Sequence, residues 1–182
     1  GFDVRGRESQ QEILMKRLLL CQIITMFMTL QKDGDFVLKV FDIFTPFTAA
    51  LIWILYRHFE KICIIKPLPS RPANSERYVV CRNLKVHRPK ITTYLLEVNR
   101  KFDEIRTSDG QDINEIVEFE VMKKDEEFMN YLETSNMKTA VMQTNAIKEL
   151  QKYIDEPDLE MPKQDEYRRL CLQEWGITKA EE

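Results

Sequence analysis

The sequence predicts an α/β protein in which a small sheet is followed by a run of helices. Two short apolar runs, 35–41 and 62–65, have the length and aliphatic content of buried strands. The stretch 46–59 between them is helical in spacing, so residues 35–66 predict a βαβ unit, which should be right-handed. A third run, 76–81, follows a connection too short for a crossover helix, so it should be antiparallel to the second strand.

A long helix is predicted before the first strand. Ser9 and Glu12 have the spacing of a capping box, in which the serine caps the helix and the glutamate reaches back. Apolar residues then recur at helical spacing from Ile13 to Met28, which indicates a mostly buried helix. The polar sequence 32–34 ends it.

The second helix has its own start pattern. Thr45 can cap it, and Pro46 occupies the first turn, where its missing N–H costs nothing. The proline-rich stretch 67–75 after the second strand predicts a loop. This loop leaves the carboxyl end of that strand, at the same edge as Lys39.

After residue 90 the sequence pattern predicts helices, and no residue in this part is assigned a chemical role. Residues 107–111 read as a polar turn and 115–122 as an ambiguous stretch with some strand character. Pro162 should begin the last helix and Gly176 should end it. The predicted helices cover residues 93–106, 126–133, 140–154 and 163–175.

Composition sets limits on the class of protein. The chain has 182 residues, of which 43% are hydrophobic and 31% charged, which is typical of a folded domain rather than a disordered one. The apolar stretches 18–30 and 44–56 are shorter than the roughly 20 residues that span a bilayer, so no membrane partner is expected. The four cysteines form no CxxC pair and only two histidines accompany them, which predicts reduced thiols and no metal site.

Charge is unevenly distributed along the chain. Residues 1–106 contain 18 Lys or Arg against 11 Asp or Glu, a net charge of +7, whereas residues 107–182 have a net charge of −10. The basic part is densest from Arg57 to Arg106. It suits a polyanion such as RNA, with an ordinary solvated surface as the alternative.

Lys39 interrupts an otherwise apolar strand. A strand buried on both faces would force its ammonium out of water, at a cost of several kcal/mol unless it is paired or lies at a functional cleft. Ligands of open α/β sheets bind beyond the carboxyl ends of the strands, where Lys39 would lie. The alternative is an edge lysine that extends to water. The strand alone does not decide between them.

The order of elements around Lys39 resembles the Rossmann-like ribose 2′-O-methyltransferases of the FtsJ type. Residues 34–42 are similar to the strand that carries the second lysine of that family. Residues 66–78 are similar to the segment that carries its glutamate.

The likeness is greatest to one branch, the eukaryotic cap-specific mRNA 2′-O-ribose methyltransferases that make cap 1. Residues 41–47 and 70–81 are very similar to the corresponding sequences of that branch, and residues 168–177 resemble the end of its catalytic domain. The resemblance covers nearly the whole chain. It implies that residues 1–90 are the C-terminal half of the methyltransferase core, and that residues 91–182 are a helical extension completing the same domain.

Activity, cofactor and partners are further implications of the resemblance. These enzymes use a Lys-Asp-Lys-Glu tetrad with S-adenosylmethionine, so Lys39 would be a catalytic lysine and Glu76 its partner. The substrate would be the 5′ end of capped mRNA, with the transcription or capping machinery as further partners. The nucleus would be the location, with the cytoplasm as a second one.

The residue types suit this chemistry. A ribose 2′-hydroxyl is a very weak acid, so a lysine aimed at its oxygen can orient it and help to remove its proton. The resemblance places Arg71, Asn74, Ser75 and Arg77 where contacts to RNA backbone and sugar would be made. For Glu76 and Arg71, the alternative is a structural ion pair that closes the loop.

The resemblance also points to Glu8 as a cap contact. Glu8 and Ser9 lie where the cap-specific branch has a Glu-Asn pair; the glutamate matches and the serine does not. A carboxylate can accept hydrogen bonds from the ring N–H and amino group of guanine. A helix-start carboxylate favoured by the helix dipole is an equally good interpretation.

Three parts of the family site have no counterpart in this sequence. The first lysine, the glycine-rich cofactor loop and the tetrad aspartate come earlier in the family, the aspartate just before Gly1. None of the five glycines forms a GxG loop. We therefore expect the chain alone neither to hold S-adenosylmethionine well nor to methylate RNA. A non-catalytic RNA-binding or protein-interaction remnant of the fold, and an FtsJ-type enzyme acting on rRNA or tRNA, remain as alternatives.

Overall fold

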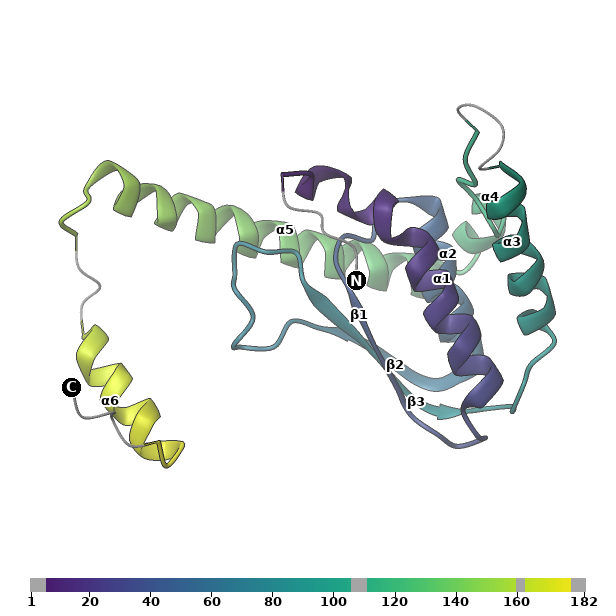
Figure 1. The fold of residues 1–182 in the computed structure, drawn as a ribbon, viewed down its shortest axis with the longest axis horizontal. Coiled ribbons are helices and arrows are strands. Elements are labelled where there is room, and N and C mark those ends of the chain that lie inside the picture. The colour runs from purple at the N-terminus through teal and green to yellow at the C-terminus, as the bar shows by residue number, and fades with distance from the viewer. Residues whose placement is uncertain (1–5, 106–110, 160–162, 178–182) are drawn as a thin grey trace. The chain divides into compact units, whose positions relative to one another are not determined.

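A computed structural model describes residues 6–105, 111–159 and 163–177 (Figure 1). The chain divides into two compact units, Gly1–Gln143 and Thr144–Glu182, and the boundary falls within one long helix. The elements are η1 (Glu8–Gln10), α1 (Gln11–Thr29), β1 (Phe36–Val40), α2 (Pro46–His58), β2 (Phe59–Ile65), β3 (Arg77–Leu84), α3 (Ile91–Ile105), α4 (Phe119–Lys123), α5 (Glu126–Asp155) and α6 (Gln164–Glu174).

The three strands form one sheet in the order β1-β3-β2, and β3 is antiparallel to both neighbours. This confirms the predicted antiparallel pairing of the third strand with the second. Strands β1 and β2 run in the same direction but do not touch, because β3 lies between them. Lys39 and Ile65 are both opposite Tyr78, so β1 and β2 end at the same edge of the sheet.

One face of the sheet is covered and the other is open within the described residues. Leu38 and Val40 of β1, with Val79 and Cys81 of β3, are buried in the core with α1 and α2. Figure 1 shows α1, α2 and α3 gathered on one side of the sheet. On the opposite face, residues of β1 such as Val37 and Lys39 are exposed.

The prediction that the first strand is buried on both faces is therefore wrong for the described part of the chain. Burial in β1 alternates from residue to residue, which is the pattern of a strand with one solvated face. A run of aliphatic residues reports how apolar a strand is, but not whether anything covers its second face.

The capping-box prediction is also wrong. Helix α1 begins at Gln11, its N-cap is Gln10, and no side chain caps it. The Glu12 carboxylate turns instead to the start of α2, where Oε1 accepts hydrogen bonds from the backbone N–H of Phe44 (3.0 Å) and of Thr45 (2.8 Å), and from Thr45 Oγ1 (2.8 Å). A tertiary contact with three donors has replaced a local contact with one.

The start of α2 confirms its prediction. Thr45 is the N-cap and its Oγ1 accepts a hydrogen bond from the backbone N–H of Thr48 at 3.2 Å, with Pro46 in the first turn. The helix ends at His58, and Phe59 begins β2 without a loop. Residues of α2 fill the centre of the core, including Phe47, Leu51 and Leu55.

The helical part after residue 90 is simpler than predicted. Helix α3 is confirmed, residues 115–122 contain no strand, and the short helix α4 begins at Phe119. The two helices predicted at 126–133 and 140–154 are one helix, α5, because the residues between them include no glycine or proline to interrupt it. Helix α6 ends before Gly176, which has a positive φ of 63°, as predicted. Pro162 lies outside the described residues.

The described residues include neither a membrane-spanning helix nor a metal-binding cluster. No helix there is both long and apolar enough to cross a membrane. That same part of the chain contains no group of three or more His, Cys, Asp or Glu side chains arranged to hold a metal ion.

Candidate active site

Lys39 and Glu76 form an ion pair at the edge where β1 ends and β3 begins. The distance from Lys39 Nζ to Glu76 Oε2 is 2.6 Å. Lys39 lies opposite Tyr78, two residues after Glu76, so all three side chains project from the same, open face of the sheet. The Lys39 side chain is 49% exposed and that of Glu76 22% exposed. The pair is thus open to a ligand while Glu76 remains partly enclosed.

Hydroxyl groups hold the second oxygen of Glu76. Its Oε1 accepts from Tyr78 OH at 3.2 Å and from Ser70 Oγ at 3.5 Å. The hydrogen bond from Lys39 is the main influence that lowers the pKa of Glu76; burial opposes it, and Tyr78 and Lys66 add to the lowering. Glu76 is therefore an anion near neutral pH, and Lys39 is its nearest cation.

The loop between β2 and β3 delivers Glu76 to this place. Lys66, just after β2, donates from Nζ to Ser70 Oγ (3.1 Å), to the Asn74 carbonyl (2.6 Å) and to the Glu76 carbonyl (3.0 Å). At the other end of the loop, Asn74 Oδ1 accepts from the Glu76 N–H at 2.8 Å. The loop is closed around the ammonium of Lys66, which fixes the backbone on which Glu76 stands.

The predicted RNA-contacting residues of this loop divide into two groups. Arg71 is exposed, in a position to meet a polyanion, and Asn74 is half-buried with its Oδ1 already engaged by the Glu76 backbone. Ser75 is only 8% exposed and its hydroxyl is hydrogen-bonded to Asp42. Ser75 therefore braces the interior of the protein, and its predicted contact with RNA is not supported by its position.

Arg77 corrects the sequence-based prediction most clearly. It is 1% exposed, so its guanidinium does not reach a surface where RNA could bind. Its Nε and Nη2 both donate to the Phe41 carbonyl, at 3.2 and 2.9 Å, and its Nη1 donates to Asn136 Oδ1 of α5 at 2.8 Å. Arg77 is a structural residue that ties the chain just after Lys39 to the chain just after Glu76.

Three residues of this framework were not singled out as site residues from the sequence: Glu12, Lys66 and Asn136. Asn136 Nδ2 donates to the Ile43 carbonyl at 2.7 Å, so α5 contacts the same segment that Arg77 and Glu12 hold. For Lys66, its position directly before a proline-rich loop was an available indication. For Asn136, 59 residues from its partner Arg77, no local pattern would have found it.

Glu8 gives no structural test of cap recognition. Its backbone belongs to η1, directly before α1, but its side chain lies outside the described part of the structure. The proposed contact with the methylguanosine end stays a prediction.

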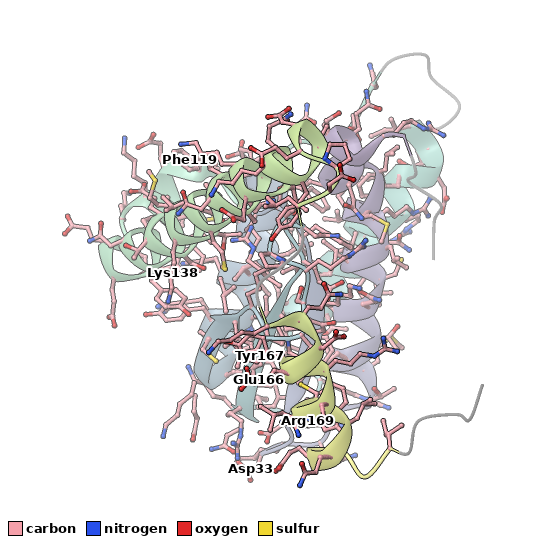
Figure 2. All side chains as sticks on the ribbon, turned by 90° about the vertical axis from the view of Figure 1, so that its left-hand side faces the viewer. Asp33, Phe119, Lys138, Glu166, Tyr167 and Arg169 are labelled. Carbon is pink, nitrogen blue, oxygen red and sulfur yellow. The ribbon has the colours of Figure 1, made fainter. Side chains whose placement is uncertain are left out.

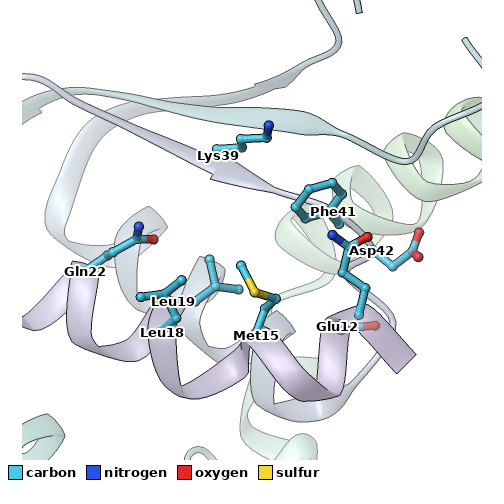
Figure 3. Close-up of a pocket in the computed structure, with 9 residues that line it drawn as sticks. Glu12, Met15, Leu18, Leu19, Gln22, Lys39, Phe41 and Asp42 are labelled. Carbon is cyan, nitrogen blue, oxygen red and sulfur yellow. The ribbon is translucent and has the colours of Figure 1, made fainter. Parts of the chain in front are cut away.

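A small pocket lies between the end of β1 and helix α1, on the α1 side of Lys39 (Figure 3). Its volume is about 90 Å³. Sites for ligands of drug size occupy roughly 300–1,000 Å³, so this pocket does not enclose a nucleoside cofactor such as S-adenosylmethionine. The described residues near Lys39 do not by themselves fit that cofactor. The pocket is lined by Gln11, Glu12, Met15, Leu18, Leu19, Gln22, Lys39, Phe41 and Asp42.

The described residues form an α/β unit with a lysine–glutamate pair at one end of the sheet, and a proline-rich loop leads from β2 to the glutamate. Sequence comparison identifies the class of protein that such a unit resembles. Residues 1–84 match the family model described as FtsJ-like methyltransferase. The match covers all three strands and both members of the pair. Residues 1–84 are therefore similar to the FtsJ-like methyltransferases.

Individual relatives extend the likeness over nearly the whole chain. The chain is 45% identical over 177 residues to the cap-specific mRNA (nucleoside-2′-O-)-methyltransferase 1 of Bos taurus, and 44% identical over 177 residues to that of Homo sapiens. With the protein of the same name from Dictyostelium discoideum it shares 40% over 180 residues. These alignments cover 97–98% of this chain but only 21–23% of each relative, so the chain spans about a fifth of their length.

Proposed function

We propose that this chain supplies the part of an active site that activates the acceptor in methylation of the ribose 2′-hydroxyl of the first transcribed nucleotide of capped mRNA. One observation carries the proposal: the 2.6 Å Lys39–Glu76 pair lies on an open sheet edge, within the residues that match FtsJ-like methyltransferases. The names of the relatives support capped mRNA as the substrate.

The geometry suits a lysine that acts on a hydroxyl. Glu76 occupies one N–H of the Lys39 ammonium and leaves others free to point away from the sheet. A ribose hydroxyl placed against Lys39 would be oriented by hydrogen bonding, and its proton would leave more readily beside a cation. The Phe41 ring, 5.4 Å from Lys39 Nζ, restricts the side chain from the other side.

The same proposal includes the larger architecture. We place residues 1–90 in the C-terminal half of a Rossmann-like methyltransferase sheet, with the open edge of β1 available for further strands. S-adenosylmethionine would then be held mainly by residues beyond those described here, as the greater length of the relatives allows. A nuclear location, with the cytoplasm as a second one, and partners in the capping or transcription machinery belong to the proposal in the same way.

The test uses a catalytically complete protein that contains this sequence. Lys39→Ala should reduce methyl transfer to capped RNA by at least about 100-fold, the usual contribution of a positioned acid–base group, without loss of folding. Lys138→Met is a matched control, because Lys138 is an exposed lysine on α5 (Figure 2). Near-normal turnover by Lys39→Ala would overturn the assignment and favour the non-catalytic alternative.

A further inference from the structure

We propose that Lys66 is a positioning residue for the reaction: its ammonium closes the 67–75 loop and holds Glu76 in the place from which it orients Lys39. The inference rests on the proposed function. It adds a second lysine, directly after strand β2, that need not touch the substrate.

Every donor of Lys66 is used by the loop and by Glu76 at its end. Its three acceptors are Ser70 Oγ, the Asn74 carbonyl and the Glu76 carbonyl, at 2.6–3.1 Å. An ammonium has three N–H donors, so no donor remains for a ligand. This saturation separates Lys66 from Lys39, which has a single acceptor among the described hydrogen bonds and ion pairs.

Lys66 reaches Glu76 by two routes. One is direct, through the Glu76 carbonyl. The other passes through Ser70, whose Oγ accepts from Lys66 and donates to Glu76 Oε1. A chain of contacts therefore runs from Lys66 through Ser70 and Glu76 to Lys39, and it fixes both the backbone and the carboxylate of Glu76.

Lys66 and Glu76 also interact electrostatically. Among the described residues, the charged and titratable groups facing Glu76 are Lys39 from β1, Lys66 from the end of β2 and Tyr78 from β3. Burial lowers the pKa of Lys66, while Glu76 raises it and Arg77 lowers it further. Lys66 in turn helps to lower the pKa of Glu76. The two groups favour each other's charged forms, so removal of Lys66 should make Glu76 easier to protonate.

A purely structural loop anchor makes a different prediction. It would change the amount of folded protein but would leave the pH dependence of the folded enzyme alone. A positioning residue changes kcat more than KM and moves the acid limb of the pH–rate profile, because that limb reports the protonation of Glu76.

The experiment compares Lys66→Met, Lys66→Arg and the Lys138→Met control in a complete enzyme acting on capped RNA. For Lys66→Met we expect kcat to fall by about 10- to 100-fold, as displacement of catalytic groups by about 1 Å does. The acid limb should move to higher pH. Lys66→Arg keeps the charge, so the limb should stay near its original pH, but a planar guanidinium does not match acceptors arranged around an ammonium, so kcat should still fall.

Parallel variants separate this inference from the proposed function. If Lys39→Ala and Glu76→Gln abolish turnover while Lys66→Met has a normal kcat and pH profile, the role of Lys66 is overturned and the proposed function stands. If all three variants turn over normally, the proposed function itself fails. If Lys66→Met does not fold, Ser70→Ala decides, since it removes only the side-chain route: a raised acid limb supports the inference and an unchanged profile overturns it.

Discussion

Glu76 and Arg77 are neighbours in the chain but serve opposite faces of the sheet. Glu76 projects from the open face and pairs with a half-exposed lysine, whereas Arg77 is 1% exposed and donates to the Phe41 carbonyl and to Asn136. The difference shows that a charged residue near such a loop cannot be assigned as a ligand contact from its sequence alone. Its face of the strand decides whether it meets a substrate or supports the scaffold.

The largest effect on stability should come from the covered face. Arg77→Met removes the donors to the Phe41 carbonyl and to Asn136, and should lower the free energy of unfolding by about 3 kcal/mol, since buried partners are left unsatisfied. Chemical denaturation of the chain measures it. Arg82→Met is the control from the open face of the same strand: its side chain is 63% exposed and pairs with Asp35, so it should cost at most about 1 kcal/mol. Equal losses in the two variants would contradict the comparison.

An intermediate effect is expected at the junction of α1 and α2. Glu12→Ala deletes the acceptor of three hydrogen bonds at the start of α2 and should cost about 2 kcal/mol, because bonds to a carboxylate are stronger than neutral ones. Glu12→Gln keeps an acceptor oxygen and should cost less than half as much. Thermal unfolding followed by circular dichroism compares the two. If Ala and Gln behaved alike, the carboxylate would not be what holds this junction.

A smaller effect on stability is expected for the Lys39–Glu76 pair. Lys39→Met breaks an ion pair that is half exposed on the lysine side, so the free energy of unfolding should change by no more than about 1 kcal/mol. In a complete enzyme the same change should nevertheless abolish most methyl transfer. A large loss of stability in this variant would indicate that Lys39, like Arg77, has a structural role.

The smallest effect is a dependence of stability on acid pH. Hydrogen bonding from Lys39 lowers the pKa of Glu76 below its ordinary value of 4.5. The contribution of Glu76 is therefore complete above that pH and is lost as the pH falls through the lower, folded-state value. Glu76→Gln should flatten this part of a plot of unfolding free energy against pH. A slope below pH 4.5 that matches the wild type would exclude Glu76 as its source.

Local chemistry determined much of the fold. The Thr45-Pro46 start of α2, the Gly176 end of α6 and the antiparallel third strand all follow from backbone rules that act within a few residues. Local rules failed where a distant partner offered more. Glu12 left its predicted cap for three donors at the start of α2. The continuity of α5, by contrast, is a local property that the prediction missed, because no glycine or proline interrupts the helix between residues 134 and 139.

The sequence by itself indicated that Lys39 and Glu76 lie in one site. Residues 34–42 and 66–78 resemble the corresponding segments of a known family, and the region that matches the family model confirms this resemblance. Only the tertiary structure decided that β1 has an open face, that Arg77 is buried, and that Lys66 and Asn136 brace the pair. The physical reason is that burial and hydrogen-bond partners depend on which element lies opposite a residue. Contacts such as the one between Arg77 and Asn136, across 59 positions, leave no periodic pattern in the chain.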